Sequence, residues 1–423
     1  MSITTVSRHL SSSSFLFPFP SSSLNFSYSI SKGRDCNFRK NMSSSSHPIQ
    51  ASSTSSSSLP LPQDRIVVGV GGTVVDYLAT VDAFPNPDDK IRSTSLKVQG
   101  GGNAGNALTC AARLGLNSRL ISKLANDAQG RGIVEELEAD GVDTSHLVVS
   151  KDGNSPFTYI IVDNQRKTRT CIHTPGYPPM VPHDMTQSSL MSALDGARIV
   201  YSDVRLHETA LVVAQEASRR NIPILVDAEK KRDGLDELLN LADYVAWTEA
   251  SSIPSALVSM LMILPNLKFV IVTLGDDGCI MLERSLDVLI TSSRSPPPGS
   301  LQPEEVDVDS SLQLLKQRVD GSSTIPTCIS SKSVVSLSAK GIGAVNGRLL
   351  VGTAEKIPPS ELIDTTGAGD AFIGATLYAI CAGMPPEKML PFASQVAGAS
   401  CRALGARTGL PWRTDPRITP HLL

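Results

Sequence analysis

The sequence lacks several features that would place it in other protein classes. It contains no apolar run of the roughly 18 residues that a membrane-spanning helix needs. Its 7 cysteines include no CxxC pair and no secretory apolar segment precedes them, which argues against a disulfide framework or a zinc site. A formal net charge of -3 without long basic runs argues against nucleic acid or an anionic membrane as the main partner. A soluble globular protein that binds a small molecule is the class that remains.

Acidic residues are also scarce in residues 1–62, where Asp35 is the one acid among many serines. This composition predicts a disordered transit peptide that directs the protein to the chloroplast or another plastid. Two alternatives stay open. The segment can be a tail with no targeting role, and Met42 offers an internal start that would give a cytoplasmic form.

The rest of the chain alternates short apolar runs with helical periodicity, which predicts a mainly parallel sheet flanked by helices on both faces. We expect one domain over 63–414, which begins with a strand near Ile66, and a C-terminal tail over 415–423. The expected strands are 117–121, 197–201, 222–226, 244–246 and 269–274. The expected helices are 104–114, 130–140, 208–219, 254–264 and 371–382.

Two segments depart from this alternation. The runs 157–162 and 168–172 flank a polar turn, which predicts a β-hairpin. Residues 291–340 are rich in proline, serine and acids, and we expect them to form a long disordered insertion.

The most informative motif is the string Asp364-Thr-Thr-Gly-Ala-Gly-Asp-Ala-Phe372, which directly precedes a long apolar helix. Its glycines allow several backbone N–H groups to point at one place, and the helix N-terminus adds partial positive charge there. Such a cradle suits a transferring phosphoryl group, and Asp370 at its edge could accept the proton of an attacking hydroxyl. The simpler interpretation is a glycine turn with an aspartate cap.

A second glycine cluster, Gly100-Gly-Gly-Asn-Ala-Gly-Asn-Ala107, opens the first long helix. Glycines would let the backbone approach a sugar ring. Asn103 and Asn106 share one helical face, and their amides offer donors and acceptors to neighbouring hydroxyls. A packing turn is the alternative for this cluster.

Together the two motifs resemble the signatures of the ribokinase-like sugar kinases, also called the phosphofructokinase-B family, and the order of elements is closest to its ketohexokinase-like members. The resemblance extends from about Ile66 to Arg407. It implies a ribokinase-like α/β fold with a small β lid from about 86–101 and 155–173. It also implies Asp370 as the catalytic base, an anion hole at Gly367, Ala368 and Gly369, and sugar contacts from Asp76, Asp88, Gly102, Asn103 and Asn106.

By the same resemblance, the cofactors are ATP and Mg²⁺, with a monovalent cation as a further candidate and no metal ligand assigned. The nucleotide contacts implied are Thr273, Gly275, Gly278, Thr366, Gly367 and, with packing as an equal alternative, Gly398. Arg205 could reach a phosphate or form a surface ion pair. The family's lid sheets imply a homodimer paired through the lid.

One motif of the family is missing. Many members carry Asn-x-x-Glu after the strand that ends here near Ala246, where this chain continues Trp247-Thr-Glu-Ala-Ser251. The function we expect is ATP-dependent phosphorylation of a ketohexose or pentose such as fructose or ribose. The alternatives are a nucleoside kinase of the same fold and a non-catalytic plastid scaffold.

Overall fold

The computed structural model describes residues 61–63, 65–166, 168–247, 253–285, 305–331 and 334–422. The predicted leader lies almost wholly outside these residues and stays a prediction. Most of the segment where the Asn-x-x-Glu motif is missing also lies outside them. None of the described helices is long and apolar enough to cross a bilayer.

The main sheet has twelve strands. In spatial order they are β13 (Glu305–Asp307), β15 (Val335–Ala339), β16 (Gly343–Gly352), β12 (Cys279–Arg284), β11 (Phe269–Thr273), β10 (Tyr244–Trp247), β9 (Ile224–Asp227), β8 (Ile199–Ser202), β1 (Ile66–Val70), β4 (Asn117–Ala125) and β5 (Leu147–Ser150), and β14 (Cys328–Ser330) pairs with β16. Every pairing from β5 to β11 is parallel, whereas β12 and β16 are antiparallel to their neighbours. Helices cover both faces of this sheet, so the predicted fold class is confirmed.

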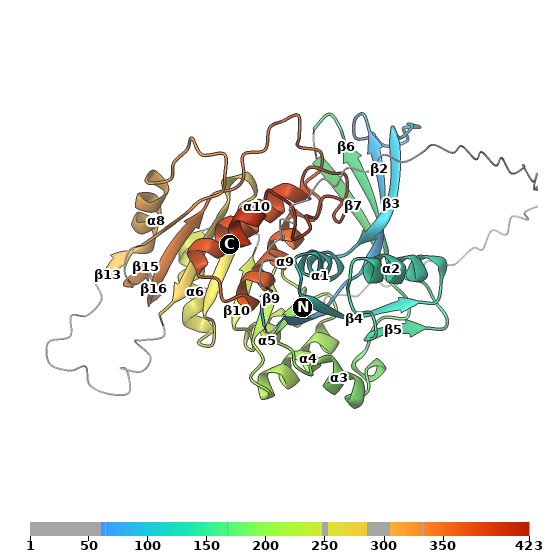
Figure 1. The fold of residues 1–423 in the computed structure, drawn as a ribbon, viewed down its shortest axis with the longest axis horizontal. Coiled ribbons are helices and arrows are strands. Elements are labelled where there is room, and N and C mark those ends of the chain that lie inside the picture. The colour runs from blue at the N-terminus through green and yellow to red at the C-terminus, as the bar shows by residue number, and fades with distance from the viewer. Residues whose placement is uncertain are drawn as a thin grey trace, which may run out of the picture. The chain divides into compact units, whose positions relative to one another are not determined.

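Two separate apolar cores lie on the two faces of the sheet. The helices of the first core are α1 (Asn103–Arg113), α2 (Ala128–Ala139), α9 (Ala368–Cys381) and α10 (Pro386–Ser400). Those of the second are α3 (Gln187–Ala193), α4 (His207–Arg219), α5 (Leu235–Leu239), α6 (Ile253–Ile263) and α8 (Val308–Gln317). In Figure 1, α9 and α10 lie in front of the main sheet and the lid strands stand at the upper right.

The lid is a four-stranded sheet in the order β3 (Ser95–Gly101), β2 (Val74–Val81), β6 (Phe157–Asp163) and β7 (Thr168–Thr174). The hairpin expected at 157–172 is β6 and β7, paired antiparallel. The predicted lid omitted β2, which is a central strand and pairs with β3 and β6. Residues 86–94 were expected in the lid but form irregular loop, and the lid strand begins at Ser95.

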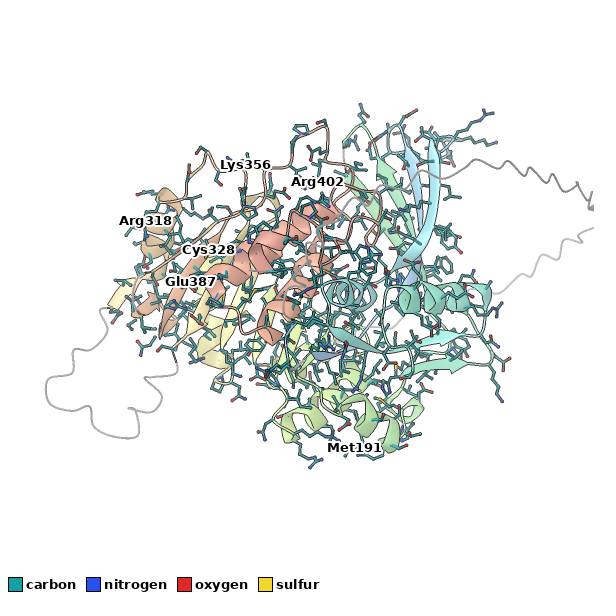
Figure 2. All side chains as sticks on the ribbon, viewed as in Figure 1. Met191, Arg318, Cys328, Lys356, Glu387 and Arg402 are labelled. Atoms are coloured by element: carbon teal, nitrogen blue, oxygen red, sulfur yellow. The ribbon has the colours of Figure 1, made fainter. Side chains whose placement is uncertain are left out.

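The expected disorder of 291–340 is wrong for the described residues 305–331 and 334–340, which form β13, α8, β14 and β15. Asp307 caps α8 by accepting a hydrogen bond from the amide of Ser310 (2.8 Å), and Val308, Leu312 and Leu315 are buried in the second core. Their spacing is helical, so the acidic composition hid an amphipathic helix. Figure 2 marks Cys328 of β14 near Glu387 of α10, where this segment meets the first core.

The segment 415–423, expected to be a tail, packs on the domain over its described part. Ile418 is fully buried in the first core, and the short helix α11 (Thr419–Leu422) follows it. Asp415 accepts hydrogen bonds from the amide and the guanidinium of Arg417, which fixes the turn before that helix.

Helices α1 and α9 pack against each other at very short range. A Cβ at Gly374 of α9 would lie 2.6 Å from both the carbonyl oxygen of Ala107 and the Cβ of Cys110 on α1. Glycine is therefore the residue that this approach requires. The contact brings the N-terminal signature on α1 against the C-terminal signature on α9.

Gly374→Ala should destabilise the domain, because the added methyl group must push α1 away from α9; overpacking of this kind costs about 1–3 kcal/mol. Gly132→Ala is the matched control, since nothing lies within 4 Å of a Cβ at Gly132 on the exposed side of α2. That change should stabilise the helix by about 0.5–1 kcal/mol. Urea unfolding measures the free energy of unfolding of both variants. The same change in this free energy for Gly374→Ala and Gly132→Ala would contradict the packing described.

Candidate active site

A cavity of about 840 Å³ opens between the lid and the carboxyl ends of the main-sheet strands. Its walls come from β2, β6 and β7 of the lid, from the first turns of α1 and α9, and from the ends of β9, β10 and β11. Ligands of open α/β sheets bind at this edge. Of the residues predicted from the sequence, the cavity collects Asp76, Gly102, Asn103, Asn106, Thr273, Thr366, Gly367, Gly369 and Asp370.

The N-terminus of α9 forms the floor of the cavity. Gly367 caps the helix with φ 75°, in the left-handed region, and a Cβ there would lie 2.6 Å from the Cβ of Ala406. Among the described residues, no acceptor is bonded to the amides of Gly367, Gly369 or Asp370. The amide of Ala368 donates to the carbonyl of Thr365 (3.3 Å) and Ala368 does not line the cavity, so the expected anion hole loses this member. The three other N–H groups and the helix dipole make an anion cradle.

The loop before this helix is fixed by Asp364. Its Oδ1 accepts from the amide (3.0 Å) and the hydroxyl (2.7 Å) of Thr366, and its Oδ2 accepts from the amide of Gly405 (2.8 Å). Thr366 therefore lines the cavity with its hydroxyl proton already donated. Its role is to hold the cradle in shape.

Asp370 lies at the edge of the cradle, where Asn106 Nδ2 donates to its Oδ2 (2.8 Å). Burial raises the pKa of Asp370 to about 7, and the bond from Asn106 opposes that rise. Glu229 raises this pKa further and Arg205 lowers it. A carboxyl that titrates near neutral pH can both take and release a proton, as a general base must.

The opposite wall carries the residues predicted to hold a sugar. Asp76 of β2 is 5% exposed, and burial raises its pKa to about 7 against the opposing effects of Arg407 and the Thr158 hydroxyl. Gly102 precedes α1 with φ 87°. The amide of Asn103 accepts from Arg205 Nη2 (3.1 Å) and donates to Glu229 Oε2 (3.4 Å), so both of its ends are engaged at the cavity wall.

Asp203, which sequence reasoning missed, joins the segments that carry these groups. It is 3% exposed and accepts hydrogen bonds from the amides of Gly72 (2.8 Å), Ala104 (3.2 Å) and Arg205 (3.0 Å). The next residue, Val204, has φ 62°, which a β-branched residue rarely adopts. This backbone directs Arg205 to the cavity, where it bonds to Asn103 and Glu229.

Asp88 does not belong to this site. It is exposed, with φ 67°, in the loop between β2 and β3, and it does not line the cavity. Its neighbour Asp89 closes a turn by accepting from the amide of Asn86 (2.8 Å). The structure therefore does not bring Asp88 to the cavity, and its sugar contact stays a prediction.

Two of the glycines expected to bind nucleotide, Gly275 and Gly278, lie near Thr273 but outside the cavity. Gly275 is exposed in the turn η2 (Gly275–Asp277), with nothing within 4 Å of a Cβ. Gly278 has φ 85° and packs directly on the carbonyl of Gly352. Neither glycine lines the cavity, whereas Thr273 at the end of β11 does.

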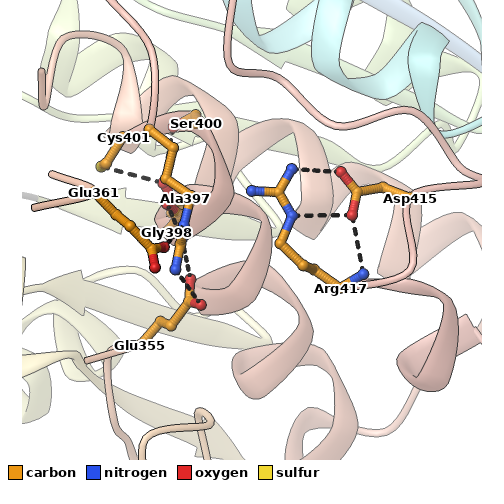
Figure 3. A network of polar contacts seen from close by, with 9 residues as sticks. Glu355, Glu361, Ala397, Gly398, Ser400, Cys401, Asp415 and Arg417 are labelled. Atoms are coloured by element: carbon orange, nitrogen blue, oxygen red, sulfur yellow. Dashed lines mark hydrogen bonds and ion pairs between the residues drawn. The ribbon is translucent and has the colours of Figure 1, made fainter. Parts of the chain in front are cut away.

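Gly398 is also outside the cavity. The carboxylate of Glu355 occupies the space beside it and forms a two-point ion pair with Arg402 (both contacts 2.9 Å), which also bonds to Glu361 (2.8 Å). Figure 3 shows Glu355 and Glu361 beside Gly398. Glycine is required there so that Glu355 can approach α10. The packing alternative for Gly398 is the one that this geometry supports.

Several cavity residues had no place in the sequence predictions. Arg169, Cys171 and His173 alternate along β7 and face the cavity, and Asp227 and Glu229 follow the apolar run of β9. Two sequence signals could have identified these residues. One is the i, i+2, i+4 spacing on β7, and the other is the pair of acids at and after the end of β9.

Comparisons with known proteins agree with this geometry. A family model described as pfkB family carbohydrate kinase matches residues 64–296 and 317–413. Mouse ketohexokinase is 24% identical over 350 residues, which cover 81% of this chain and 98% of that protein. The structure of Arabidopsis thaliana ribokinase complexed with ribose and ATP has a TM-score of 0.57 at 18% identity and covers 85% of this chain and 98% of that one. The nucleoside kinase of Methanocaldococcus jannaschii has a TM-score of 0.55 at 20% identity, with 86% and 99% covered.

The pKa values of the two carboxyls predict a steep acid limb in the pH profile. Both have a pKa of about 7, so if catalysis needs Asp370 and Asp76 ionised, log kcat/KM should fall below that pH with a slope of up to two. Asp76→Asn removes one ionisation and should reduce the slope to one. Initial rates between roughly pH 5 and pH 9 measure both slopes. A flat profile across neutral pH would contradict the burial of these two groups.

Proposed function

Since the chain belongs to the pfkB family of carbohydrate kinases, we propose that it transfers the γ-phosphoryl group of ATP to a hydroxyl of a small sugar. The observation that carries this proposal is the pairing of Asp370 with the unbonded amides of Gly367 and Gly369 at the start of α9. A base stands there beside a ready-made site for negative charge.

The sugar would lie against Asp76, Gly102 and Asn106, with the accepting hydroxyl next to Asp370. Asp76 can accept hydrogen bonds from two hydroxyls, and Asn106 keeps one N–H that is not given to Asp370. As the hydroxyl oxygen attacks the γ-phosphorus, its proton passes to Asp370, and the bond from that phosphorus to the bridging oxygen breaks so that ADP leaves. The amides of Gly367 and Gly369 then stabilise the charge on the transferred group without reorganising.

Cations on both walls supply further stabilisation. Arg205 faces Asp370 from the main domain, and Arg169 of the lid donates to the hydroxyl of Thr365 beside the cradle (2.9 Å). Phosphate oxygens bound at the cradle would meet both guanidinium groups. Since Arg169 belongs to β7, lid closure and phosphate binding are coupled, and closure keeps water from competing as acceptor.

Mg²⁺ would enter with ATP and neutralise charge on its phosphates. The described part of the chain offers no group of three or more metal-binding side chains, but Asp227 and Glu229 line the cavity with oxygen ligands. Burial, together with the charges of Asp370 and Glu229, raises the pKa of Asp227 well above its usual value, so a cation there would be favourable. One or two carboxylates plus substrate phosphates is an arrangement that Mg²⁺ accepts. A monovalent cation stays a prediction.

Fructose and ribose are the first substrates to test, because ketohexokinase and ribokinases are among the relatives. A nucleoside kinase is the second candidate, since nucleoside kinases match at similar TM-scores and the cavity also contains Trp247, on which a base could stack. ADP release with MgATP and a panel of fructose, ribose, adenosine and inosine separates these candidates. Absence of ATP and sugar binding by calorimetry would instead favour a non-catalytic scaffold.

Asp370→Asn should lower kcat by about a hundredfold or more on the accepted substrate, because general-base catalysis of this kind contributes about 10²–10⁴. Binding of the sugar should change little, since the base acts mainly in the transition state. Asp195→Asn, on an exposed loop away from the cavity, is the control and should keep wild-type turnover. Near wild-type kcat in Asp370→Asn would refute the assignment of the base.

We also propose a homodimer through the outer face of the lid. Val98, Tyr77, Tyr159 and Ile172 form one row across the four strands, and Val98, Tyr159 and Ile172 are 54%, 51% and 53% exposed. Leu96 in the next row is 66% exposed. A second copy related by a two-fold axis would place the same apolar rows against each other.

Tyr159→Asp should make the protein monomeric, because it would bury two like charges at the centre of the proposed interface. Val149→Asp is the control: Val149 is 52% exposed on β5, an edge strand of the main sheet that is not part of the lid, and this change should leave the dimer intact. Analytical ultracentrifugation measures both. A monomeric wild-type protein would refute the proposal.

A further inference from the structure

Arg407 is a buried cation directly behind the cavity. It lies in the segment after α10, is 1% exposed, and does not line the cavity. Burial lowers the pKa of Arg407, and the nearby acids Glu136 and Asp76 oppose that shift. Glu136 Oε1 lies 3.6 Å from its Nη1. A fully buried guanidinium is costly to maintain and calls for a specific account.

The glycine cluster before α1 makes room for this side chain. A Cβ on Gly100 or on Gly105 would overlap the guanidinium of Arg407. These two glycines therefore make room for Arg407, which agrees with the packing alternative for this part of the cluster. Only Gly102 of the cluster's glycines lines the cavity.

The guanidinium is held by three acceptors. Nη2 donates to the carbonyl of Gly101 (2.9 Å) and to the hydroxyl of Thr73 (3.4 Å), and Nε donates to Oδ1 of Asn106 (3.0 Å). The other end of the same amide, Asn106 Nδ2, donates to Asp370 (2.8 Å). Arg407, Asn106 and Asp370 thus form a continuous hydrogen-bonded chain.

The chemistry of this chain permits one orientation of Asn106. An arginine has donors only, so it must face the amide oxygen and leaves the NH₂ group to face Asp370. A flipped amide would set NH₂ against the guanidinium and oxygen against the carboxylate, and both contacts would be repulsive. The identity of residue 407 therefore decides which end of Asn106 meets the base.

We propose that Arg407 is a positioning residue for phosphoryl transfer, which fixes the amide of Asn106 so that its N–H group orients Asp370 toward the accepting hydroxyl. Arg407 touches neither substrate in this arrangement. The inference rests on the proposed function, because Asp370 is taken as the base.

Loss of this orientation has a directional effect on Asp370. The bond from Asn106 lowers the pKa of Asp370 against the effect of burial, so a disordered amide lets that pKa rise. Among the described residues, the other titratable or charged groups around Asp370 are Cys110 on α1, Tyr201 on β8, Asp203 and Arg205 after β8, Asp227 at the end of β9 and Glu229 after it. Arg407→Lys changes none of these groups and keeps the positive charge, but it removes the planar fork that reaches Asn106, Gly101 and Thr73 together.

Arg407→Lys should lower kcat by roughly ten- to a hundredfold, because a catalytic group that is misplaced by up to about 1 Å can lose this much rate. KM for the sugar should change much less, and the acid limb of kcat should move to higher pH. Arg119→Lys is the matched control, because Arg119 holds the carbonyls of Ala193 (2.9 Å) and Asp195 (2.7 Å) far from the cavity. Arg119→Lys should lower the stability of the protein in urea without changing kcat or the acid limb of its pH profile.

The double variant tests whether Arg407 acts through Asn106. In an Asn106→Ala background, Arg407→Lys should cause no further loss of kcat, since the connection is already cut. If Arg407→Lys lowers kcat by the same factor in the wild-type and Asn106→Ala backgrounds, the proposal is overturned and Arg407 has a purely structural role. An unmoved pH limb in the single variant would overturn it as well.

A measurement without substrate separates this inference from the proposed function. The side-chain ¹⁵N amide signal of Asn106, assigned by its absence in Asn106→Ala, should titrate with Asp370 in the wild-type protein and lose that titration in Arg407→Lys. If the panel of sugars and nucleosides gives no ADP, the kinase proposal fails, while this titration still decides whether Arg407 fixes the amide of Asn106 against Asp370. An identical titration in both proteins would refute the positioning role.

Discussion

The hydrogen bond between Asn106 and Asp370 is the contact on which the site depends. Its two residues are 264 positions apart in the chain, and they meet because Gly374 lets α9 approach the backbone of α1. The same short approach places the glycine turn before α1 and the glycine turn before α9 at one cavity. Without it, the sugar-binding wall and the anion cradle would belong to separate surfaces.

Around that contact, the protein gathers more buried carboxylates than a stable core favours. Asp76, Asp227 and Asp370 all have raised pKa values, chiefly because burial disfavours their charged forms. Fixed positive charge offsets part of this cost through Arg205, Arg407 and the amides at the start of α9. A divalent cation that entered with a nucleotide would offset the remainder, which connects the electrostatics of this pocket to phosphoryl transfer.

The features predicted correctly from the sequence are those whose signal is local. The string that begins at Asp364 and the Asn103–Asn106 spacing each contain their own turn and helix start, and the apolar runs marked the parallel strands. The contacts between distant segments are what the sequence did not reveal. Gly278 and Gly398 matched a nucleotide pattern, yet Gly352 and Glu355 decide their surroundings, and Asp88 was assigned to a lid strand that begins only at Ser95. Arg407 was missed because nothing adjacent in the sequence reveals that Gly100 and Gly105 make room for it.

A crystal structure with a non-hydrolysable ATP analogue and the accepted sugar would show whether the start of α9 binds phosphate beside a base. We expect terminal phosphate oxygens bound to the amides of Gly367 and Gly369, and the accepting hydroxyl within hydrogen-bond reach of Asp370, about 2.6–3.2 Å. A sugar whose hydroxyls all face away from Asp370, or a nucleotide whose phosphates avoid the start of α9, would contradict it.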